Sequence, residues 1–551
     1  MYVVLARGPD GPTAQRFDDA AHPLDDATPV GDLAAFVATI EPETPRWVWD
    51  DTRHWYPELL AAGVRVERCV DLRLSHAILR NSTVTAASAL ARGRPSEWDR
   101  MPVELVAPRQ RAEALFDLED ESGASEPDPV AEWLLQREAT TASADPGRIG
   151  LLLAAESAGA LIACEMKFAG LPLDPAIHDR LLVELLGPRP RGTERPAKLE
   201  ALLDELKRIL EQDDVNPDSP NELLKALGRA GMQVTSTRSW ELKQIDHPVI
   251  APLLEYKKLS RLMTANGWNW LETWVADGRF RPEYLPGGVV TGRWAASGGG
   301  ALQLPKQIRG AVVADDGWKL VVADASQLEP RILSAMSADR RMAEAGRGDL
   351  YEGIVASGAV STRAEAKVAM LGAMYGATSG ESGRLLPGLV RAFPQALALV
   401  EEAARAGERG EIVTTRLGRS SPLPGSAWQA VQGEASGDAQ ADRRAKSAAR
   451  SWGRFTRNFI VQGSAAEWAL CWMAGLRQRL WSMSDGGIVE RPHLVFFLHD
   501  EVMVHTPAHL ADQVVEEVRA AAVDAGRLLF GAMPVDFPVT AVAVDVYADA
   551  K

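Results

Sequence analysis

A carboxylate stands at the expected end of a buried strand near the middle of the chain. Residues 320–323 (Leu-Val-Val-Ala) form a short apolar and β-branched run, and Asp324 follows them directly. An acid at the tip of a strand is held on a rigid element, as a catalytic metal ligand must be. The structural alternative is that Asp324 only forms a turn, because Asp side chains bond their own backbone there.

One carboxylate cannot hold a catalytic metal pair, so a partner must come from elsewhere in the chain. The best candidate is the segment 494–505, in which two apolar runs flank His499, Asp500 and Glu501. This pattern predicts a β-hairpin with two acids at its turn. The sequence therefore predicts that Asp324 and Asp500 converge, although most of the C-terminal half separates them.

A predicted helix over residues 362–374 carries side chains of interest at steps of four, namely Arg363, Lys367, Leu371 and Tyr375. Such steps keep side chains on one slowly rotating face. Two cations on that face can clamp a polyanion, and the aromatic side chain can pack against a planar ring. The alternative is a solvated basic stripe that ends in a core tyrosine.

Two further segments are suited to contact with a phosphate backbone. The glycine-rich stretch 287–300 contains Thr291-Gly-Arg293, and glycine lets a backbone pass close to a ligand. Farther on, basic residues recur at mostly three- and four-residue steps and run into Gln462: Arg443, Lys446, Arg450, Arg454, Arg457 and then Asn458. This is the most basic helix-like face of an acidic chain, so we expect local contact with phosphates.

Composition limits the class of protein. The 551 residues are 46% hydrophobic and 25% charged, which is typical of globular domains. The net charge of −15 argues against indiscriminate coating of nucleic acid, but it permits a local basic groove. Three widely spaced cysteines show no metal-ligand pattern and predict buried thiols in a reducing cytoplasm. We see no signal peptide and no uninterrupted apolar run long enough to span a bilayer, so we expect no membrane partner.

Together these motifs resemble family A DNA polymerases, the bacterial DNA polymerase I type. The resemblance covers residues 151–551, and each motif is weak alone, but their ordered set is specific. Five segments carry it: Thr291-Gly-Arg293 with Leu302-Gln303; Asp324-Ala-Ser-Gln-Leu-Glu-Pro-Arg331; Arg363-Ala-Glu-Ala-Lys367 with Tyr375-Gly376; Arg454, Asn458 and Gln462-Gly463; and His499-Asp500-Glu501.

The resemblance implies an α+β multidomain fold. An RNase H-like α/β domain would precede a right-hand polymerase with a helical thumb, an antiparallel-sheet palm and helical fingers. The implied domains are an exonuclease-like domain at 1–150, a thumb at 151–285, palm segments at 286–340 and 431–551, and fingers at 341–430.

The implied activity is template-directed DNA synthesis, in which a nucleotidyltransferase adds dNTPs to a primer 3′-hydroxyl. Such enzymes use two divalent ions, here Mg²⁺ with Mn²⁺ as the alternative. Asp324 and Asp500 would bridge both ions, and the carbonyl of Ala325 would complete the shell of one. Glu501 would stand behind these catalytic ligands.

The remaining roles are also implied by the resemblance. Arg363 and Lys367 would hold the triphosphate, with Lys367 passing a proton to the leaving pyrophosphate, while Tyr375 would lie against the nascent base pair. Glu329 would exclude a ribose hydroxyl, and Gln327 would line the same nucleotide pocket. The implied DNA contacts are Thr291, Arg293, Gln303, Arg454, Asn458, Gln462 and His499; Arg293 and Gln462 would read the minor groove.

Three positions of the polymerase motifs depart from the family pattern. Leu371 replaces an aromatic residue that packs against the incoming sugar and base, which predicts weaker nucleotide binding and altered tolerance of 3′-deoxy analogues. Ala325 replaces another aromatic residue. Pro330 replaces an aliphatic residue, and because proline is tolerated only in a first helical turn, the helix should begin near Glu329.

The N-terminal domain departs further. Residues 2–7 contain no acid-x-acid pair, and Leu153-Ala-Ala-Glu-Ser157 resembles the last exonuclease motif with Leu and Ser where Tyr and Asp belong. Asp50, Asp51 and Asp71 remain, and we interpret them as turn or surface acids. We therefore predict a domain that keeps the fold and has lost 3′–5′ proofreading. The chain is also too short at its start for the family's 5′-nuclease.

Two other functions were weighed against the polymerase. A catalytically silent DNA-binding or scaffolding paralogue would have no physical reason to keep Asp324, Asp500, Arg363 and Lys367 together. A metal-dependent nuclease would need the acids that the N-terminal domain lacks. We expect a monomer with primer–template DNA and dNTPs as partners, located in the cytoplasm at the nucleoid and acting in gap filling or lesion tolerance.

Overall fold

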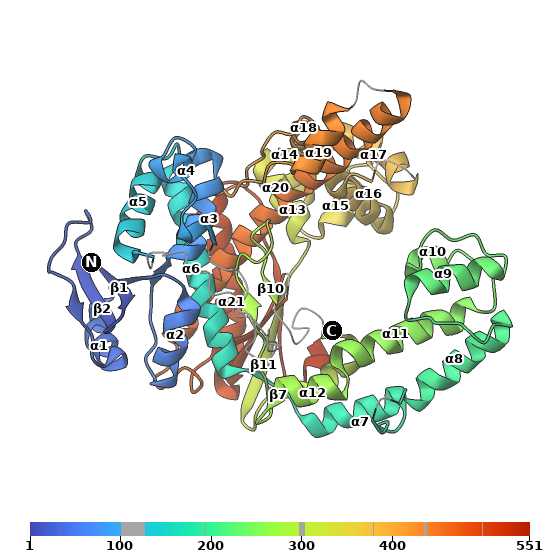
Figure 1. Ribbon diagram of the computed structural model, residues 1–551, viewed down its shortest axis with the longest axis horizontal. Coiled ribbons are helices and arrows are strands. Elements are labelled where there is room, and N and C mark those ends of the chain that lie inside the picture. Colours follow the sequence, from blue (N-terminus) through green and yellow to red (C-terminus); the bar gives the residue numbers. More distant parts are fainter. Residues whose placement is uncertain are drawn as a thin grey trace, which may run out of the picture. The chain divides into compact units, whose positions relative to one another are not determined.

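The computed structural model describes residues 1–100, 127–192, 194–296, 304–377, 380–434, 438–498 and 500–550. Two of the predicted site residues, Gln303 and His499, lie outside these ranges. The chain forms two compact units (Figure 1). The first comprises Met1–Phe168, Tyr284–Ala295 and Val321–Val542, and the second comprises Ala169–Glu283, Ala296–Leu320 and Ala543–Lys551.

The N-terminal part of the first unit is a five-stranded sheet with helices on both faces. Its strand order is β3 (Thr28–Pro29), β2 (Gly11–Phe17), β1 (Tyr2–Gly8), β4 (Arg46–Trp49) and β5 (Cys69–Asp71). β1 runs antiparallel to β2 and parallel to β4, and β4 runs parallel to β5. Because side chains alternate along a strand, Val3 joins one core with Leu161, whereas Val4 joins the other with Trp133. This mixed sheet agrees with the RNase H-like fold expected from the sequence.

Six α-helices accompany this sheet: α1 (Leu33–Ile40), α2 (Thr52–Ala61), α3 (Leu72–Asn81), α4 (Ala89–Arg92), α5 (Pro129–Thr141) and α6 (Pro146–Ala169). Among the described residues, α6 alone is long and apolar enough to cross a membrane, and 61% of its most apolar window is buried within the protein. Such burial is typical of the core helix of a globular domain.

A buried ion pair joins this part to the long helix α20 (Ala439–Trp481) in the same unit. The Arg477 guanidinium of α20 donates to Glu165 of α6 over 2.8 Å and to the backbone carbonyl of Glu67 over 2.8 Å. The Tyr56 hydroxyl donates to the same Glu165 carboxylate over 2.6 Å. Removing one member would leave a buried charge unpaired, so this contact fixes the N-terminal part to α20.

A four-stranded sheet carries the predicted acids. Its order is β12 (His493–Leu498), β13 (Glu501–Pro507), β11 (Trp318–Ala325) and β14 (Val539–Val544). β12 and β13 pair antiparallel, which confirms the predicted hairpin. Helix α21 (Ala511–Phe530) packs against α20, where the Trp472 indole donates to the Val518 carbonyl over 3.0 Å.

Helices between β11 and α20 also belong to the first unit, and several of them pack against α20 (Figure 1). They are α13 (Leu328–Ser337), α14 (Arg340–Ala345), α15 (Leu350–Ala356), α16 (Arg363–Tyr375), α17 (Gly380–Ala392), α18 (Pro394–Glu408) and α19 (Ser426–Gly433). α13 begins one residue before Glu329, so Pro330 lies in its first turn as predicted. α16 begins with a capping box, in which Thr362 and Glu365 satisfy each other's backbone amides.

The second unit is mainly helical. It contains α7 (Pro175–Leu186), α8 (Ala197–Leu210), α9 (Pro220–Arg229), α10 (Ser239–Leu242), α11 (Ile250–Asn266) and α12 (Trp268–Trp274). A small sheet of β6 (Leu171–Pro172), β8 (Arg279–Phe280) and β7 (Val275–Ala276) completes it. α8 and α11 pack side by side (Figure 1). The sequence predicts a thumb over residues 151–285. The α-helices of this unit lie within that range, whereas residues 151–168 of α6 belong to the first unit.

Candidate active site

Asp324 and Asp500 lie at the same end of the four-stranded sheet. Asp324 is the next-to-last residue of β11, and Asp500 occupies the turn between β12 and β13. β13 is the neighbour of β11, and the backbone amide of Ala325 donates to the backbone carbonyl of Asp500 over 2.9 Å. Both aspartates are partly exposed. The structure thus brings together the two acids that the sequence predicted to converge.

Glu501 differs from these aspartates. It is the first residue of β13, pairs with Leu498 across the hairpin and is buried. Within the described part of the chain, no group of three or more His, Cys, Asp or Glu side chains could hold a metal ion. Asp324, Asp500 and the Ala325 carbonyl would therefore leave several positions of a Mg²⁺ shell to water and substrate phosphates, which is how Mg²⁺ is usually bound.

The four predicted side chains of α16 share one exposed face. Arg363, Lys367, Leu371 and Tyr375 are all exposed, whereas Ala366, Ala369, Met370 and Ala373 are buried on the opposite face. Arg363 at the start of the helix forms an ion pair with Asp349, with 2.8 Å between Nη2 and Oδ2. The alternative of a core tyrosine at the end of this stripe is therefore wrong, because Tyr375 is 42% exposed.

A side-chain network joins four of the predicted residues from distant segments. Arg293 forms an ion pair with Glu329. The Tyr375 hydroxyl donates to Glu329 Oε2 over 3.1 Å, and Gln462 Nε2 donates to the Tyr375 hydroxyl over 3.1 Å. Burial and the neighbouring Glu329 carboxylate raise the pKa of Tyr375, so its hydroxyl stays protonated and acts as a donor. Glu329 is thus the centre of the network.

Gln327 holds the backbone around the site. It precedes α13 in the left-handed conformation, with φ of 57° and ψ of 41°. Its Oε1 accepts from the Leu350 amide over 2.9 Å and from Arg331 Nη2 over 3.3 Å. The expected role of lining a nucleotide pocket is not tested by these contacts, which tie Gln327 to the start of α15.

Arg331 is a residue of the site region whose contribution the sequence did not reveal. It is 1% exposed, and its guanidinium donates to the backbone carbonyls of Ser326, Gly346, Gly348 and Asp536. Ser326 lies just before α13, Gly346 and Gly348 lie between α14 and α15, and Asp536 lies before β14. One feature of the sequence could have indicated that Arg331 is buried, namely that it directly precedes the apolar residues Ile332 and Leu333.

The Thr291-Gly-Arg293 turn packs on a second cation, Arg419, whose side chain is 12% exposed. Gly292 has φ of +83°, and a Cβ built on it would lie 2.5 Å from Arg419 Nε, so only glycine fits there. Arg419 in turn forms an ion pair of 2.8 Å with buried Glu156 of α6. Glu156, the acid of the segment that resembles an exonuclease motif, therefore supports the turn that carries Arg293.

The residues predicted on α20 divide into exposed and buried sets. Arg443, Lys446, Arg450 and Arg454 are exposed, and Asn458 and Gln462 are partly exposed. The buried Nδ2 of Asn458 has no hydrogen-bond partner in the part of the chain that the structure describes. Arg457 does not belong to the expected phosphate-binding face: it is buried, donates to the Ala373 carbonyl over 2.9 Å and pairs with Glu401.

The interpretation of Asp51 and Asp71 as turn or surface acids is wrong in part, because both are buried. Asp51 caps α2. Burial raises the pKa of Asp51, but its ion pairs with Arg53 and Arg73 outweigh burial and lower the pKa to about 2. Asp71 caps α3 and accepts from the Thr52 amide over 2.8 Å. Burial raises the pKa of Asp71 to about 6. Each acid is thus engaged in holding a helix.

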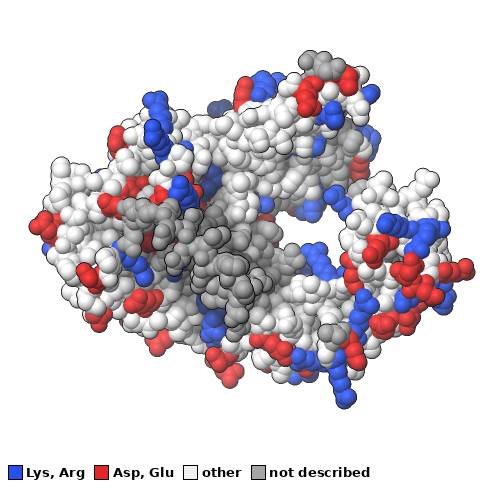
Figure 2. All heavy atoms as spheres, viewed as in Figure 1, with Lys and Arg blue, Asp and Glu red and all other residues white. Residues whose placement is uncertain are grey.

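Acidic and basic side chains are interspersed over the face seen in Figure 2, which agrees with the net charge of −15. Any contact with phosphates must therefore come from local clusters such as the exposed faces of α16 and α20.

The family model for DNA polymerase family A matches residues 191–536. The chain belongs to DNA polymerase family A. The thermostable DNA polymerase I of Thermus aquaticus is 26% identical over 413 residues, which cover 66% of this chain and 45% of that relative. The DNA polymerase I of Chloroflexus aurantiacus is 24% identical over 482 residues, which cover 79% and 46%. This family A chain thus spans about half the length of the relatives it matches.

The fold of this family A polymerase chain agrees with that of a solved structure, the POL domain of Pol1 from M. smegmatis in complex with DNA primer-template and dNTP. The likeness has a TM-score of 0.68 at 18% identity and covers 100% of this chain and 95% of the other. It shows the right-hand polymerase fold expected from the sequence.

Proposed function

We propose that this chain is a template-directed DNA polymerase that adds dNTPs to a primer 3′-hydroxyl with two divalent cations, Mg²⁺ in the first place. The observation that carries this proposal is the backbone hydrogen bond between Ala325 and Asp500, which holds the residues bearing the two carboxylates at one sheet end. Their oxygens are the hard donors that Mg²⁺ prefers. The described complex of the mycobacterial relative with primer–template and dNTP supports DNA and dNTPs as partners.

In this mechanism the protein mainly positions and neutralises charge. Asp324 and Asp500 would hold the cations, which when bound lower the barrier to attack of the 3′-oxygen on the α-phosphorus and stabilise the leaving pyrophosphate. Arg363 and Lys367 bind the triphosphate on the exposed face of α16, and Lys367 supplies a proton to the pyrophosphate. Lys367 has no ion pair or hydrogen bond to any other described residue, so it is available for this.

Glu329 selects the sugar in this proposal. Its carboxylate is fixed by Arg293 and Tyr375, so a ribose hydroxyl would have to displace an oriented and charged group. Gln462 and Arg293 contact the minor groove at the primer end. The hydrogen-bond acceptors there are common to all four Watson–Crick pairs, so these contacts test the shape of the base pair and not its sequence.

The N-terminal part is proposed to lack 3′–5′ proofreading. The support is that Asp50, Asp51 and Asp71 already bond His54, two arginines and helix amides. Release of nucleotides from a mismatched primer, removed by Asp51→Ala, would contradict this. An enzyme of this kind is suited to gap filling or lesion tolerance.

Extension of a labelled primer with dNTPs and MgCl₂ tests the polymerase activity. Wild type is expected to extend the primer. Asp324→Asn should extend it at least about a thousandfold more slowly, because a bridging carboxylate is removed. Asp485→Asn changes an exposed loop residue, serves as the control and should extend the primer normally. Binding of primer–template by wild type without extension would instead establish the scaffolding paralogue.

A further inference from the structure

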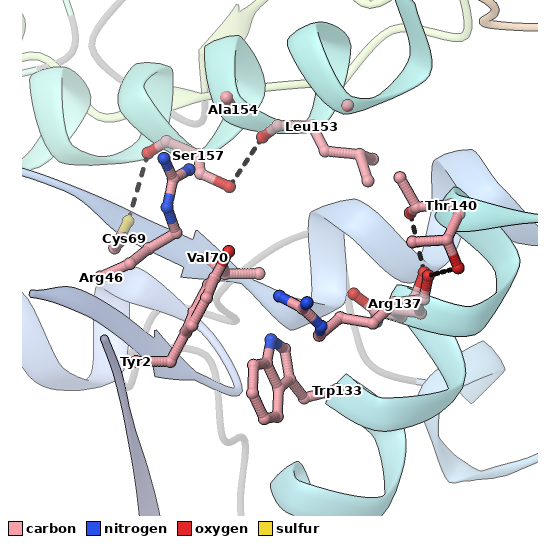
Figure 3. Close-up of a pocket in the computed structure, with 13 residues that line it drawn as sticks. Tyr2, Arg46, Cys69, Val70, Trp133, Arg137, Thr140, Leu153, Ala154 and Ser157 are labelled. Carbon is pink, nitrogen blue, oxygen red and sulfur yellow. Dashed lines mark hydrogen bonds between the residues drawn. The ribbon is translucent and has the colours of Figure 1, made fainter. Parts of the chain in front are cut away.

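A pocket lies in the N-terminal sheet, at the end where its parallel strands begin (Figure 3). Tyr2, Arg46 and Cys69 are the first residues of β1, β4 and β5, and all three line the pocket. Residues of α5 and α6 form the other walls. Asp50 and Asp51 come after the last residue of β4, so the pocket is at the opposite end of that strand from these acids.

The lining of the pocket is positively charged. Among the residues that the structure describes, it contains two arginines and no aspartate or glutamate, in a chain whose net charge is −15. The Arg46 guanidinium has no hydrogen bond or ion pair to any other described residue. Arg137 donates to the backbone carbonyl of Asp19 over 2.6 Å, and this leaves further N–H groups, because a guanidinium has five. The described lining of the pocket therefore offers two cations and no carboxylate.

Two aromatic rings, Tyr2 and Trp133, lie next to Arg137. In Figure 3 the Tyr2 ring lies between the side chains of Arg46 and Arg137. The Arg137 guanidinium stacks on the Tyr2 ring at 4.9 Å and on the Trp133 ring at 5.3 Å, and the two rings are 5.0 Å apart. Partly exposed Tyr2 also presents a hydroxyl that has no partner among the described residues. Cations with an aromatic wall are suited to a planar ring that carries an anion.

A buried acceptor adds a second kind of contact. Gln136 lines the same pocket and is 3% exposed. Its Nε2 donates to the Leu72 carbonyl over 2.9 Å and to Glu132 over 2.6 Å, while its Oε1 has no hydrogen-bond partner among the described residues. An unsatisfied buried oxygen is costly, and an N–H group of a ligand would relieve it.

We propose that this pocket binds a nucleoside monophosphate, with the phosphate bound by the guanidinium groups of Arg46 and Arg137 and the base against the partly exposed Tyr2 ring. The proposal does not depend on polymerase activity, because the pocket shares no residue with the candidate active site. The N-terminal part would then bind a nucleotide at a site separate from Asp50 and Asp51, and without the metal ions that a proofreading site would need.

Isothermal titration calorimetry on the full chain tests the proposal. The protein carries Arg363→Ala and Lys367→Ala, so that the face of α16 contributes no nucleotide binding. The probes are dAMP, inorganic phosphate and deoxyadenosine. We expect one dAMP per chain, weaker binding of phosphate, and little binding of the nucleoside.

The variant Arg46→Ala is decisive because its guanidinium makes no contact that folding would miss. It is expected to raise the Kd for dAMP about tenfold or more, as the loss of a charge-assisted hydrogen bond would. Arg148→Ala, an exposed arginine of α6 outside the pocket, is the matched control and should leave the Kd unchanged. Absence of dAMP binding, or a Kd that Arg46→Ala does not alter, would overturn the proposal, and phosphate bound as tightly as dAMP would overturn the nucleoside part of it.

Discussion

Glu467 provides a test of how a buried acid supports the candidate site. It lies on α20, is 1% exposed, and contacts the loop that carries Arg419. Its Oε2 accepts from the Leu417 amide over 2.9 Å, and its Oε1 bonds the Thr415 hydroxyl. That hydroxyl also donates to the Arg419 carbonyl over 3.1 Å. A hydroxyl has one hydrogen, so Thr415 cannot donate to Glu467 and to the Arg419 carbonyl at the same time. A protonated Glu467 would supply the hydrogen that one of these two bonds lacks.

The pKa agrees with this hydrogen-bond count. Burial raises the pKa of Glu467 from 4.5 to about 7. The folded protein therefore holds a proton that the unfolded chain releases between these two values. The stability that the neutral acid contributes is complete below pH 4.5 and is lost as the pH rises through 7. A pKa shift of this size corresponds to a change of about 3 kcal/mol in the free energy of unfolding.

Glu467→Gln reproduces the protonated acid at every pH. Its amide can donate to Thr415 and its carbonyl can accept from Leu417, so the network stays complete. We expect the variant to melt several degrees above wild type at pH 8 and close to wild type at pH 5, as measured by differential scanning calorimetry. Glu402→Gln, an exposed glutamate of α18, is the control and should show no such pH dependence. A Glu467→Gln difference that is equal at both pH values would refute the reasoning.

Three other substitutions test individual contacts. Glu329→Ala removes the carboxylate that Arg293 and Tyr375 hold, so we expect ribonucleotide incorporation relative to dNTP incorporation to rise about tenfold or more. The measurement is the ratio of the two kcat/KM values in single-nucleotide primer extension. An unchanged ratio would contradict the sugar-selection role. Leu371→Phe adds a ring on the exposed face of α16, so binding of the incoming nucleotide should tighten and tolerance of 3′-deoxy analogues should change, and indistinguishable analogue selectivity would refute this. Arg331→Met leaves four backbone carbonyls without their donor. We expect the free energy of unfolding to fall by about 3 kcal/mol or more, and the melting temperature to fall with it. An unaltered melting temperature would show that other donors replace the guanidinium of Arg331.

Elements set by local patterns were predictable from the sequence. The apolar run before Asp324 and the paired runs around Asp500 encode strands and a turn, and both appear where expected. Steps of four placed Arg363 and Tyr375 on one face of α16, because helical geometry is local. Pro330 fixed the start of α13 through the constraint on its own backbone.

Polar contacts between distant segments were not predictable in the same way. The pairing of Glu156 with Arg419 joins residues 263 positions apart, and no periodicity relates them. Arg457 continues the basic spacing of its neighbours, yet it is buried because α16 and α18 cover that side of α20. The sequence predicts a turn or surface acid at Asp51, since nothing in its local sequence shows that Arg73 reaches it from the next helix. Such pairs are set by packing, which a local pattern does not contain.

The candidate site combines two kinds of support that should respond differently to a substrate. Asp324 and Asp500 are related through the backbone of adjacent strands, so a change in either side chain leaves the other in place. Glu329 is instead held by the side chains of Arg293 and Tyr375, and each of these can rotate to a new partner. For the proposed polymerase, this assigns rigid positions to the cation ligands and adjustable ones to the groups that test the nucleotide. A nucleotide that fits can then rearrange the selecting groups without moving the catalytic carboxylates.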